Sequence, residues 1–268
     1  MAEAQDTGSR LRSLYAGDGG VRSVFSPKVA DYAASRPDYP AALFELLARR
    51  GRPATDLVAD VGAGTGLFTD GLLRHGFRVV AVEPNAEMRR EADRRLGGAA
   101  GFRSVDGSAE ALPFAASSID LITAAQAFHW FEVERARAEF LRVLRPSGQA
   151  ALVWNDRVLD DPLHAALDEV FAHFGGAKRG ALVAHEDRSK VPRFFGAVRA
   201  EEFTWPHAHR LDEPGLLALV FSRSYMPGRA TPAGGEAAEG TRAIFRRFAA
   251  GGLVEVRYRT VLFVGRPG

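Results

Sequence analysis

The sequence of 268 residues contains no cysteine, and this absence excludes several kinds of chemistry. A chain without thiols has no disulfide framework, no thiolate metal site and no cysteine nucleophile. Long apolar stretches are also missing. No run reaches the ~20 residues of a membrane-spanning helix, and residues 1–18 lack the apolar core of a secretory signal. We therefore expect a soluble, cytoplasmic protein with no membrane partner.

The sequence also lacks a large surplus of either charge. Lysine and arginine number 35 and aspartate and glutamate 33, which leaves a formal net charge of +2. Because nucleic-acid binding usually needs a basic face or stripe, we expect no nucleic-acid partner. Hydrophobic residues make up 46% of the chain, enough at this length to bury one large core. The composition therefore predicts a single domain over residues 1–268.

Hydrophobic patterning in the first half predicts strands that alternate with helices. The expected strands are short apolar or β-branched segments at 57–61, 78–82, 102–105, 119–124 and 149–154. The expected helices lie at 67–75, from an Asn85 cap to about Arg95, and at 133–144, followed by a turn at 145–148. This alternation predicts an α/β fold with a parallel, doubly wound, Rossmann-like sheet.

Beyond Trp154 the pattern changes to that of an insertion. The expected elements are helices at 163–174, 212–225 and 236–250 and strands at 198–205 and 255–264. Gly175-Gly176 is expected to end the first of these helices, and residues 232–240 to form a mobile loop. The last strand alternates polar and apolar residues, as an edge or hairpin strand would. We therefore predict a seven-stranded, mainly parallel sheet with an antiparallel edge strand and a helical lid insertion.

The strongest local signal is a glycine-rich turn, residues 62–66, directly after the first strand. Glycines let the backbone approach a ligand closely, and the turn is expected at the carboxyl edge of the sheet, where ligands of such folds bind. Glu83 closes the second strand, and its carboxylate can accept hydrogen bonds from both hydroxyls of a ribose. These features predict a nucleoside site.

Two kinds of nucleoside cofactor are compatible with such a turn. Dinucleotide enzymes also use a glycine-rich turn followed by an acidic residue. Here the glycines fall as G-x-G-x-G and not G-x-G-x-x-G, and Asp60 precedes them. That carboxylate would repel a pyrophosphate but can face the ammonium group of a methionine. The spacing therefore favours S-adenosylmethionine over a dinucleotide.

Residues 58–66 resemble the first motif of class I S-adenosylmethionine-dependent methyltransferases, and Glu83-Pro84-Asn85 resembles their acidic second-strand motif. Other segments similar to this family are 107–114, 119–122 and 140–148, so that the resemblance covers about 58–154. Segments 32–40, 125–131 and 258–264 are similar to a small-molecule subgroup that includes relatives of trans-aconitate methyltransferase. Residues 155–240 match only loosely.

The resemblance implies a set of cofactor-binding residues. Asp60, Gly62, Ala63 and Gly64 would hold the methionine end, Glu83 the ribose, and Met88 the adenine face, although Met88 is equally compatible with core filling. Ser108, Ala109 and Glu110 would line the adenine edge; many relatives have an aspartate where Ser108 stands, a stronger acceptor than a hydroxyl. The remaining expected contacts are Tyr32, Arg36, Gly66, Pro84, Gln126 and Phe128.

Aromatic residues after the fourth strand are expected to border the reactive end of the cofactor. Aromatic rings tolerate the positive charge of a sulfonium. His129 is the candidate catalytic base, since histidine changes its protonation near neutral pH, but it could instead hydrogen-bond the cofactor or backbone. Expected substrate contacts are Trp130, Trp154, Asn155, Arg223 and Tyr225, with core packing, an Asx turn or surface solvation as the alternatives. No histidine spacing indicates a metal site.

The sequence thus predicts methyl transfer from S-adenosylmethionine to O, N or C of a small molecule, a carboxylic acid or a natural-product intermediate. The alternatives are a non-methylating use of the cofactor, such as cyclisation or elimination, and a nucleotide-binding protein that is not an enzyme. A monomer or homodimer is expected. The expected parts are an N-terminal helical lid at 1–50, a cofactor-binding core at 51–155, the substrate-side insertion with the remaining sheet at 156–252, and the terminal strand at 253–268.

Overall fold

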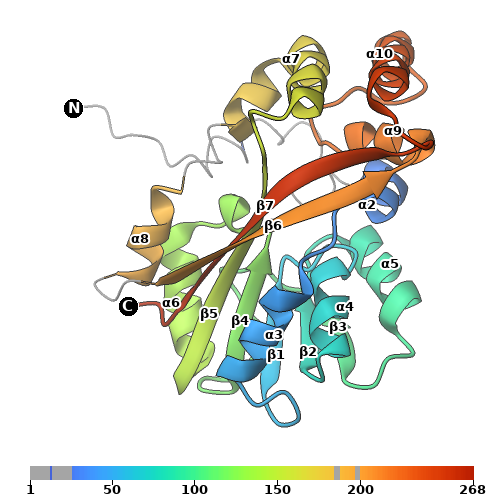
Figure 1. The fold of residues 1–268 in the computed structure, drawn as a ribbon. Coiled ribbons are helices and arrows are strands. Elements are labelled where there is room, and N and C mark those ends of the chain that lie inside the picture. The colour runs from blue at the N-terminus through green and yellow to red at the C-terminus, as the bar shows by residue number, and fades with distance from the viewer. Residues whose placement is uncertain (1–12, 14–25, 184–187, 197–199) are drawn as a thin grey trace.

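The computed structural model describes residues 13, 26–183, 188–196 and 200–268 (Figure 1). Its centre is a seven-stranded sheet in the order β3-β2-β1-β4-β5-β7-β6. The strands are β1 Leu57–Val61, β2 Arg78–Val82, β3 Phe102–Val105, β4 Ile119–Ala125, β5 Leu144–Arg157, β6 Glu201–Leu211 and β7 Val254–Gly265. The pairs among β1 to β5 are parallel, whereas β7 is antiparallel to both β5 and β6. The predicted mainly parallel sheet with antiparallel pairing at one edge is confirmed, and β6 is the outermost strand there.

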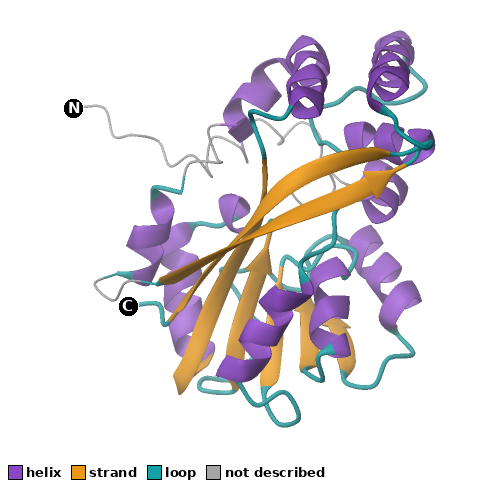
Figure 2. Cartoon of the chain, in the orientation of Figure 1, coloured by secondary structure: helices purple, strands orange, loops and turns teal. Residues whose placement is uncertain are grey.

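Helices cover both faces of the parallel strands (Figure 2). The helices are α2 Val29–Ser35, α3 Ala41–Arg50, α4 Leu67–Arg74, α5 Ala86–Leu96, α6 Val133–Val143, α7 Pro162–Val183, α8 Lys190–Phe195, α9 Glu213–Phe221 and α10 Pro232–Phe248, with short 3-10 turns η2 Ser26–Lys28 and η3 Phe128–Trp130. Side chains of a strand alternate between faces. Accordingly Leu152 packs in a core with α6 and α8, while its neighbour Val153 packs in a second core with α3 and α4.

A third hydrophobic core lies beyond the carboxyl ends of the parallel strands. The strands β6 and β7 extend past the others and meet α2, α7, α9 and α10 there (Figure 1). Phe171, Leu216, Phe221 and Val256 are buried in this core, and α2 packs against α9 although the two are far apart in the sequence. We call α2, α7, α9 and α10 the helical cap. Among the described residues no helix is both long and apolar enough to cross a bilayer.

The first half of the chain follows its predicted pattern closely. The bounds of β1, β2 and β3 agree with the predicted ones residue for residue. Asn85 caps α5, since its side-chain oxygen accepts from Glu87 N and Met88 N. The predicted turn at 145–148 lies inside β5: Leu144 already pairs with Ile119, and the register then shifts before Leu121 pairs with Gln149. The sequence predicted a turn before the strand, whereas residues 145–148 form an irregularity within it.

The second half differs more from its prediction. Gly175-Gly176 ends the first helical segment of α7, as predicted: Gly176 has φ 51° and ψ −147°, which is not helical, and a second helical segment follows to Val183. Residues 232–240, expected as a mobile loop, form the first half of α10, which begins at Pro232 after a Thr231 cap on Gly234 N. The predicted strand at 198–205 lies partly outside the described residues, and β6 continues to Leu211.

The N-terminal segment is divided between two parts of the molecule. The helix α2 belongs to the cap, whereas α3 buries Leu43, Phe44 and Leu47 against the sheet beside α4. The predicted helical lid at 1–50 therefore reaches too far, because the apolar face of α3 makes it part of the core layer. Residues 1–12 and 14–25 of that prediction lie outside the described residues.

Candidate active site

The glycine-rich turn after β1 is hydrogen-bonded to the end of β2. Gly64 has φ +56° and donates its backbone N–H to Oε2 of Glu83 at 2.9 Å, while Asn85 N donates to Oε1 at 2.8 Å. Glu83 is 8% exposed. Burial raises the pKa of its carboxyl, and the two backbone N–H donors lower it. Each carboxylate oxygen keeps a lone pair, so Glu83 can accept two further hydrogen bonds at the wall of the cavity.

Asp60 is a buried carboxylate held by two hydroxyl groups. Thr69 Oγ1 donates to Oδ2 at 2.6 Å and Thr123 Oγ1 to Oδ1 at 2.7 Å. Burial raises the pKa of Asp60 to about 6, against the lowering effect of the two hydroxyl donors. A cation placed nearby would favour the charged form. Asp60 lines a small cavity together with Ala63.

The main cavity opens beside this turn. Its cofactor end is lined by Gly62, Gly64, Glu83, Pro84, Met88, Ser108, Ala109 and Glu110, all of them predicted cofactor contacts. Met88 lies here because the Asn85 cap begins α5 just before it. Glu110 Oε1 accepts from Glu132 N at 2.8 Å, so this carboxylate also positions the start of α6.

Gly66 lies outside both cavities, unlike the other glycines of the turn. It has φ +80° at the start of α4, and a Cβ there would come within 2.7 Å of Leu96 Cδ1. Gly66 therefore allows α4 and α5 to pack closely, a structural role in place of the predicted ligand contact.

The aromatic segment after β4 is divided between core and cavity. His129, Trp130 and Phe131 line the main cavity. Phe128 was predicted as a cofactor contact but packs edge-on in the core. Its ring centroid lies 6.0 Å from that of Trp154 and 5.2 Å from that of Phe194. The 3-10 turn η3 produces this split, because it directs one ring inward between α6 and α8.

Two polar residues near this segment fix the backbone of the site. Gln126 has the unusual φ of 55°, lines both cavities and donates from Nε2 to the carbonyl of Asn155 at 3.1 Å. The Asn155 amide donates to Asp38 O at 3.0 Å and accepts from Thr260 Oγ1 at 2.6 Å. Asn155 was predicted to contact the substrate, and it does line the small cavity. Its side chain also holds in place the backbone segment before α3, a structural role that was not predicted.

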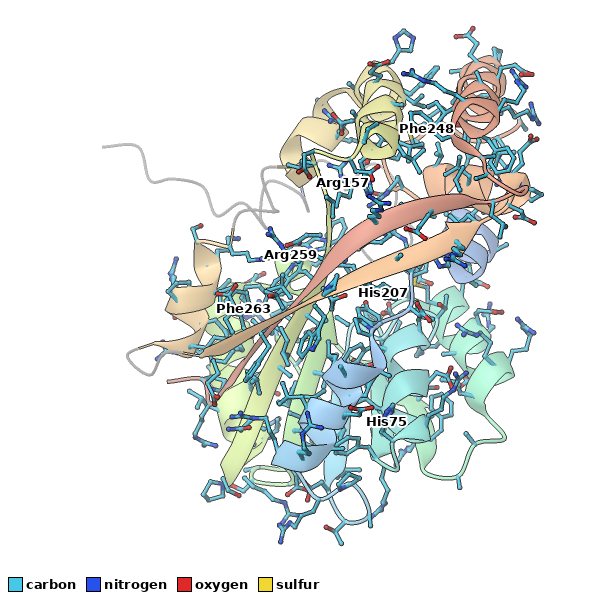
Figure 3. The ribbon with its side chains drawn as sticks, viewed as in Figure 1. His75, Arg157, His207, Phe248, Arg259 and Phe263 are labelled. Carbon is cyan, nitrogen blue, oxygen red and sulfur yellow. The ribbon has the colours of Figure 1, made fainter. Side chains whose placement is uncertain are left out.

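The acceptor end of the main cavity lies between the parallel strands and the helical cap. Here Trp154, Tyr225 and the arginines Arg157 and Arg223 complete the wall (Figure 3 labels Arg157). The small cavity continues from this end toward Asp60 and is lined by Tyr39, Tyr258 and Asn155. Tyr32, Arg36, Gly62, Gln126 and Arg223 line both cavities, which are therefore adjacent; we call the two together the connected space.

Arg157 and Tyr258 are among the polar residues of this space that sequence reasoning missed. They face each other in the register of β5 and β7, so their positions depend on the pairing of strands about 100 residues apart in the chain. The polar residues at the end of a buried strand were the available signal for Arg157. Within the described residues no group of three or more histidine, aspartate or glutamate side chains is placed to hold a metal ion.

Comparisons with known proteins agree with this geometry. A family model described as a methyltransferase domain matches residues 59–152. An uncharacterized methyltransferase of Mycobacterium tuberculosis is 36% identical over 203 residues, 75% of this chain and 76% of that protein. The structure of a candidate type II methyltransferase from Anaeromyxobacter dehalogenans superposes with a TM-score of 0.57 at 26% identity, covering 86% of this chain and 97% of that one. The chain therefore belongs to the family of class I S-adenosylmethionine-dependent methyltransferases.

Proposed function

We propose that this enzyme methylates an O, N or C atom of a small organic molecule. The observation that carries the proposal is the main cavity itself: its end built on Gly64 and Glu83 continues directly into a chamber bordered by His129, Trp130 and Trp154. Bound S-adenosylmethionine supplies a methyl group on a positively charged sulfur. The helical cap covers the chamber, which suits a small acceptor better than a folded macromolecule.

The polar groups of the cofactor end match those of S-adenosylmethionine. Glu83 has free lone pairs for the ribose hydroxyls, and Asp60 has a carboxylate whose ionisation a nearby ammonium would favour. Arg36 supplies the opposite charge for a carboxylate: its Nε is buried without a hydrogen-bond partner among the described residues, and its guanidinium carbon lies 4.5 Å from the Tyr32 ring centroid. Met88 contributes an apolar surface for the adenine.

On the acceptor side, we assign His129 the role of proton acceptor. It lines the main cavity from η3, at the carboxyl edge of β4 and beside Trp130, with ring centroids 5.2 Å apart. A neutral imidazole there can take the proton of a nucleophile as the methyl group arrives. Alignment of the two reactants by the surrounding aromatic walls contributes the larger part of the acceleration.

The proposal is tested by binding and by product analysis. In calorimetry, Glu83→Ala should weaken S-adenosylmethionine binding by roughly 1 to 3 kcal/mol, the value of lost charge-assisted hydrogen bonds. Glu87→Ala is the matched control, because Glu87 lies nearby on α5, is exposed and forms an ion pair with Arg90 on its own helix. Incubation with small-molecule acceptors should release S-adenosylhomocysteine only when an acceptor is present.

Other products would contradict methyl transfer. Release of methylthioadenosine without any acceptor would indicate a non-methylating reaction on the same fold, and tight binding with no turnover of any acceptor would indicate a binding protein. Equal affinity of the Glu83→Ala and Glu87→Ala proteins would remove the assigned ribose contact.

A further inference from the structure

The helix α2 and the segment after α9 line different ends of the main cavity and pack against each other. Tyr32 of α2 lies at the cofactor end, where a Cβ on Gly64 would come within 3.8 Å of its Cε1. Residues 222–231 connect α9 to α10, and we call them the α9–α10 loop; Tyr225 of this loop lines the acceptor end. Because α2 packs against α9 (Figure 1), the walls of the two ends are in direct contact.

Lys28 holds the α9–α10 loop against the start of α2. Its ammonium group donates to the carbonyl of Phe221 at 3.1 Å and to that of Met226 at 2.9 Å. Phe221 is the last residue of α9, where helix carbonyls lack a partner within the helix and a positive charge is favourable. The two carbonyls lie on either side of residues 222–225, so one side chain fixes both ends of the stretch that carries Tyr225.

Lys28 is partly buried at this position. Burial lowers its pKa to about 8; the charge of Asp31 raises the pKa, and the charges of Arg229 and Lys178 lower it further. The ammonium form, with its three donors, therefore still predominates at pH 7. Lys28 lines neither cavity, so any effect that it has on the reaction passes through the residues that it holds.

A second contact joins the same two segments. Arg229 of the α9–α10 loop forms a bidentate ion pair with Asp31 of α2, in which Nε donates to Oδ2 at 3.0 Å and Nη2 to Oδ1 at 2.6 Å. The Arg229 guanidinium carbon also lies 4.5 Å from the Phe221 ring centroid. Because the pair is partly exposed, we expect it to contribute less than Lys28. Its bidentate geometry still restricts how α2 and the loop can move relative to each other.

The turn before α2 is also bonded to the cofactor end. Asn85 Nδ2 donates to Ser26 Oγ at 3.2 Å, and Ser26 begins the 3-10 turn η2 that ends at Lys28. Asn85 N donates to Oε1 of Glu83, the residue to which we assign the ribose, at 2.8 Å. A short path of hydrogen bonds and backbone therefore leads from Glu83 through η2 to Lys28 and the α9–α10 loop. Such a network can couple two sites when the ligands of both sites bias its arrangement.

We infer that Lys28 is a positioning residue for methyl transfer: it fixes the α9–α10 loop to α2, so that cofactor binding orders the wall against which the acceptor lies. This inference rests on the proposed function, which puts the acceptor in the chamber that this wall completes. A cofactor that contacts Tyr32 and Arg36 restricts α2, and the contacts of Lys28 and Asp31 pass that restriction to the loop. By linkage, an acceptor held by the loop tightens cofactor binding by the same factor.

The test is hydrogen–deuterium exchange of the full-length enzyme, measured by mass spectrometry with and without saturating S-adenosylhomocysteine. In wild type the ligand should slow the exchange of backbone amides in α2 and also in residues 226–231, which line neither cavity, by at least about fivefold. In Lys28→Met the protection of α2 should remain, whereas that of residues 226–231 should fall below about twofold. Lys28→Arg keeps a cation with several donors and should restore most of the lost protection.

Two further variants make the test specific. Arg246→Met is the control, since Arg246 is exposed on α10 and lies outside both cavities, and it should show the wild-type protection. Asp31→Asn removes the ion pair with Arg229 and should lower the protection of residues 226–231 by a smaller factor than Lys28→Met. This second variant decides the question if Lys28→Met does not fold.

A purely structural role of Lys28 gives a different result. Lys28→Met would then lower the melting temperature equally with and without S-adenosylhomocysteine, and the ligand would still slow exchange in residues 226–231. That outcome, or a loop that the ligand does not protect in wild type, would overturn the inference. The exchange experiment needs no acceptor. Absence of methyl transfer to any acceptor would therefore contradict the proposed function without changing the exchange result.

Discussion

The two ends of the connected space are built in different ways. The cofactor end comes from the segments that follow β1, β2 and β3, residues 62–66, 83–88 and 108–110, which share one edge of a parallel sheet. The acceptor end gathers single residues from η3, β5, β7 and the segment after α9. The first kind of site depends on local turns and the second on long-range packing. A substitution in the first should therefore affect the cofactor alone, and one in the second the acceptor alone.

The largest effect is expected for Gly64→Val. Gly64 has φ +56° and donates its N–H to Glu83, and a β-branched residue is strongly disfavoured at this φ. The change should displace that N–H and bring a side chain toward Tyr32 and Met88, so that calorimetry detects no S-adenosylmethionine binding. Gly251→Val is the matched control, with φ +59° and open space around it. If the Gly64 variant bound S-adenosylmethionine as tightly as wild type, the turn at 62–66 would not be the cofactor end.

Sequence reasoning succeeded where the chain order determines the contact. The bounds of β1, β2 and β3 were predicted residue for residue, and the parallel pairing then places Gly64 and Glu83 side by side. At the acceptor end it found Arg223 and Tyr225 but missed Arg157 and Tyr258. Arg157 and Tyr258 are brought together by the pairing of β7 with β5, which no local sequence pattern predicts.

The prediction was weakest where one residue type serves two structural purposes. Pro232 was expected to begin a loop and instead starts α10, because proline suits the first turn of a helix as readily as it suits a loop. Phe128 and Trp130 differ little as sequence signals, yet η3 places one in the core and the other at the cavity. Tertiary packing makes these choices, so a single sequence does not determine them.

The next effect concerns the protonation of Asp60. Because its pKa in the folded protein is about 6, above the usual 3.8, folding favours the protonated form. The folded protein then binds more protons than the unfolded chain between about pH 4 and pH 6, so the free energy of unfolding falls as pH rises through this range. Asp60→Asn removes this loss, which amounts to about 3 kcal/mol. Chemical denaturation should show that the free energy of unfolding of the variant, relative to that of wild type, increases from pH 4 to pH 7.

The same substitution should weaken the cofactor complex. A bound ammonium group favours ionised Asp60, so wild-type affinity for S-adenosylmethionine should rise between pH 5 and pH 7, and that of Asp60→Asn should not. Thr69 and Thr123 can rotate their hydroxyls to suit an amide, which keeps the local structure. Parallel pH curves for the two proteins would show that another group titrates.

The smallest of these effects is expected for His129, at the acceptor end. His129→Gln keeps a polar side chain of similar reach at the cavity wall but cannot take a proton from the nucleophile. With any acceptor that supports turnover, kcat should fall by about 100-fold, while the dissociation constant for S-adenosylmethionine stays within about threefold because the cofactor end is intact. His173→Gln, exposed on α7, is the control. If His129→Gln weakened cofactor binding and left kcat unchanged, His129 would belong to the cofactor end.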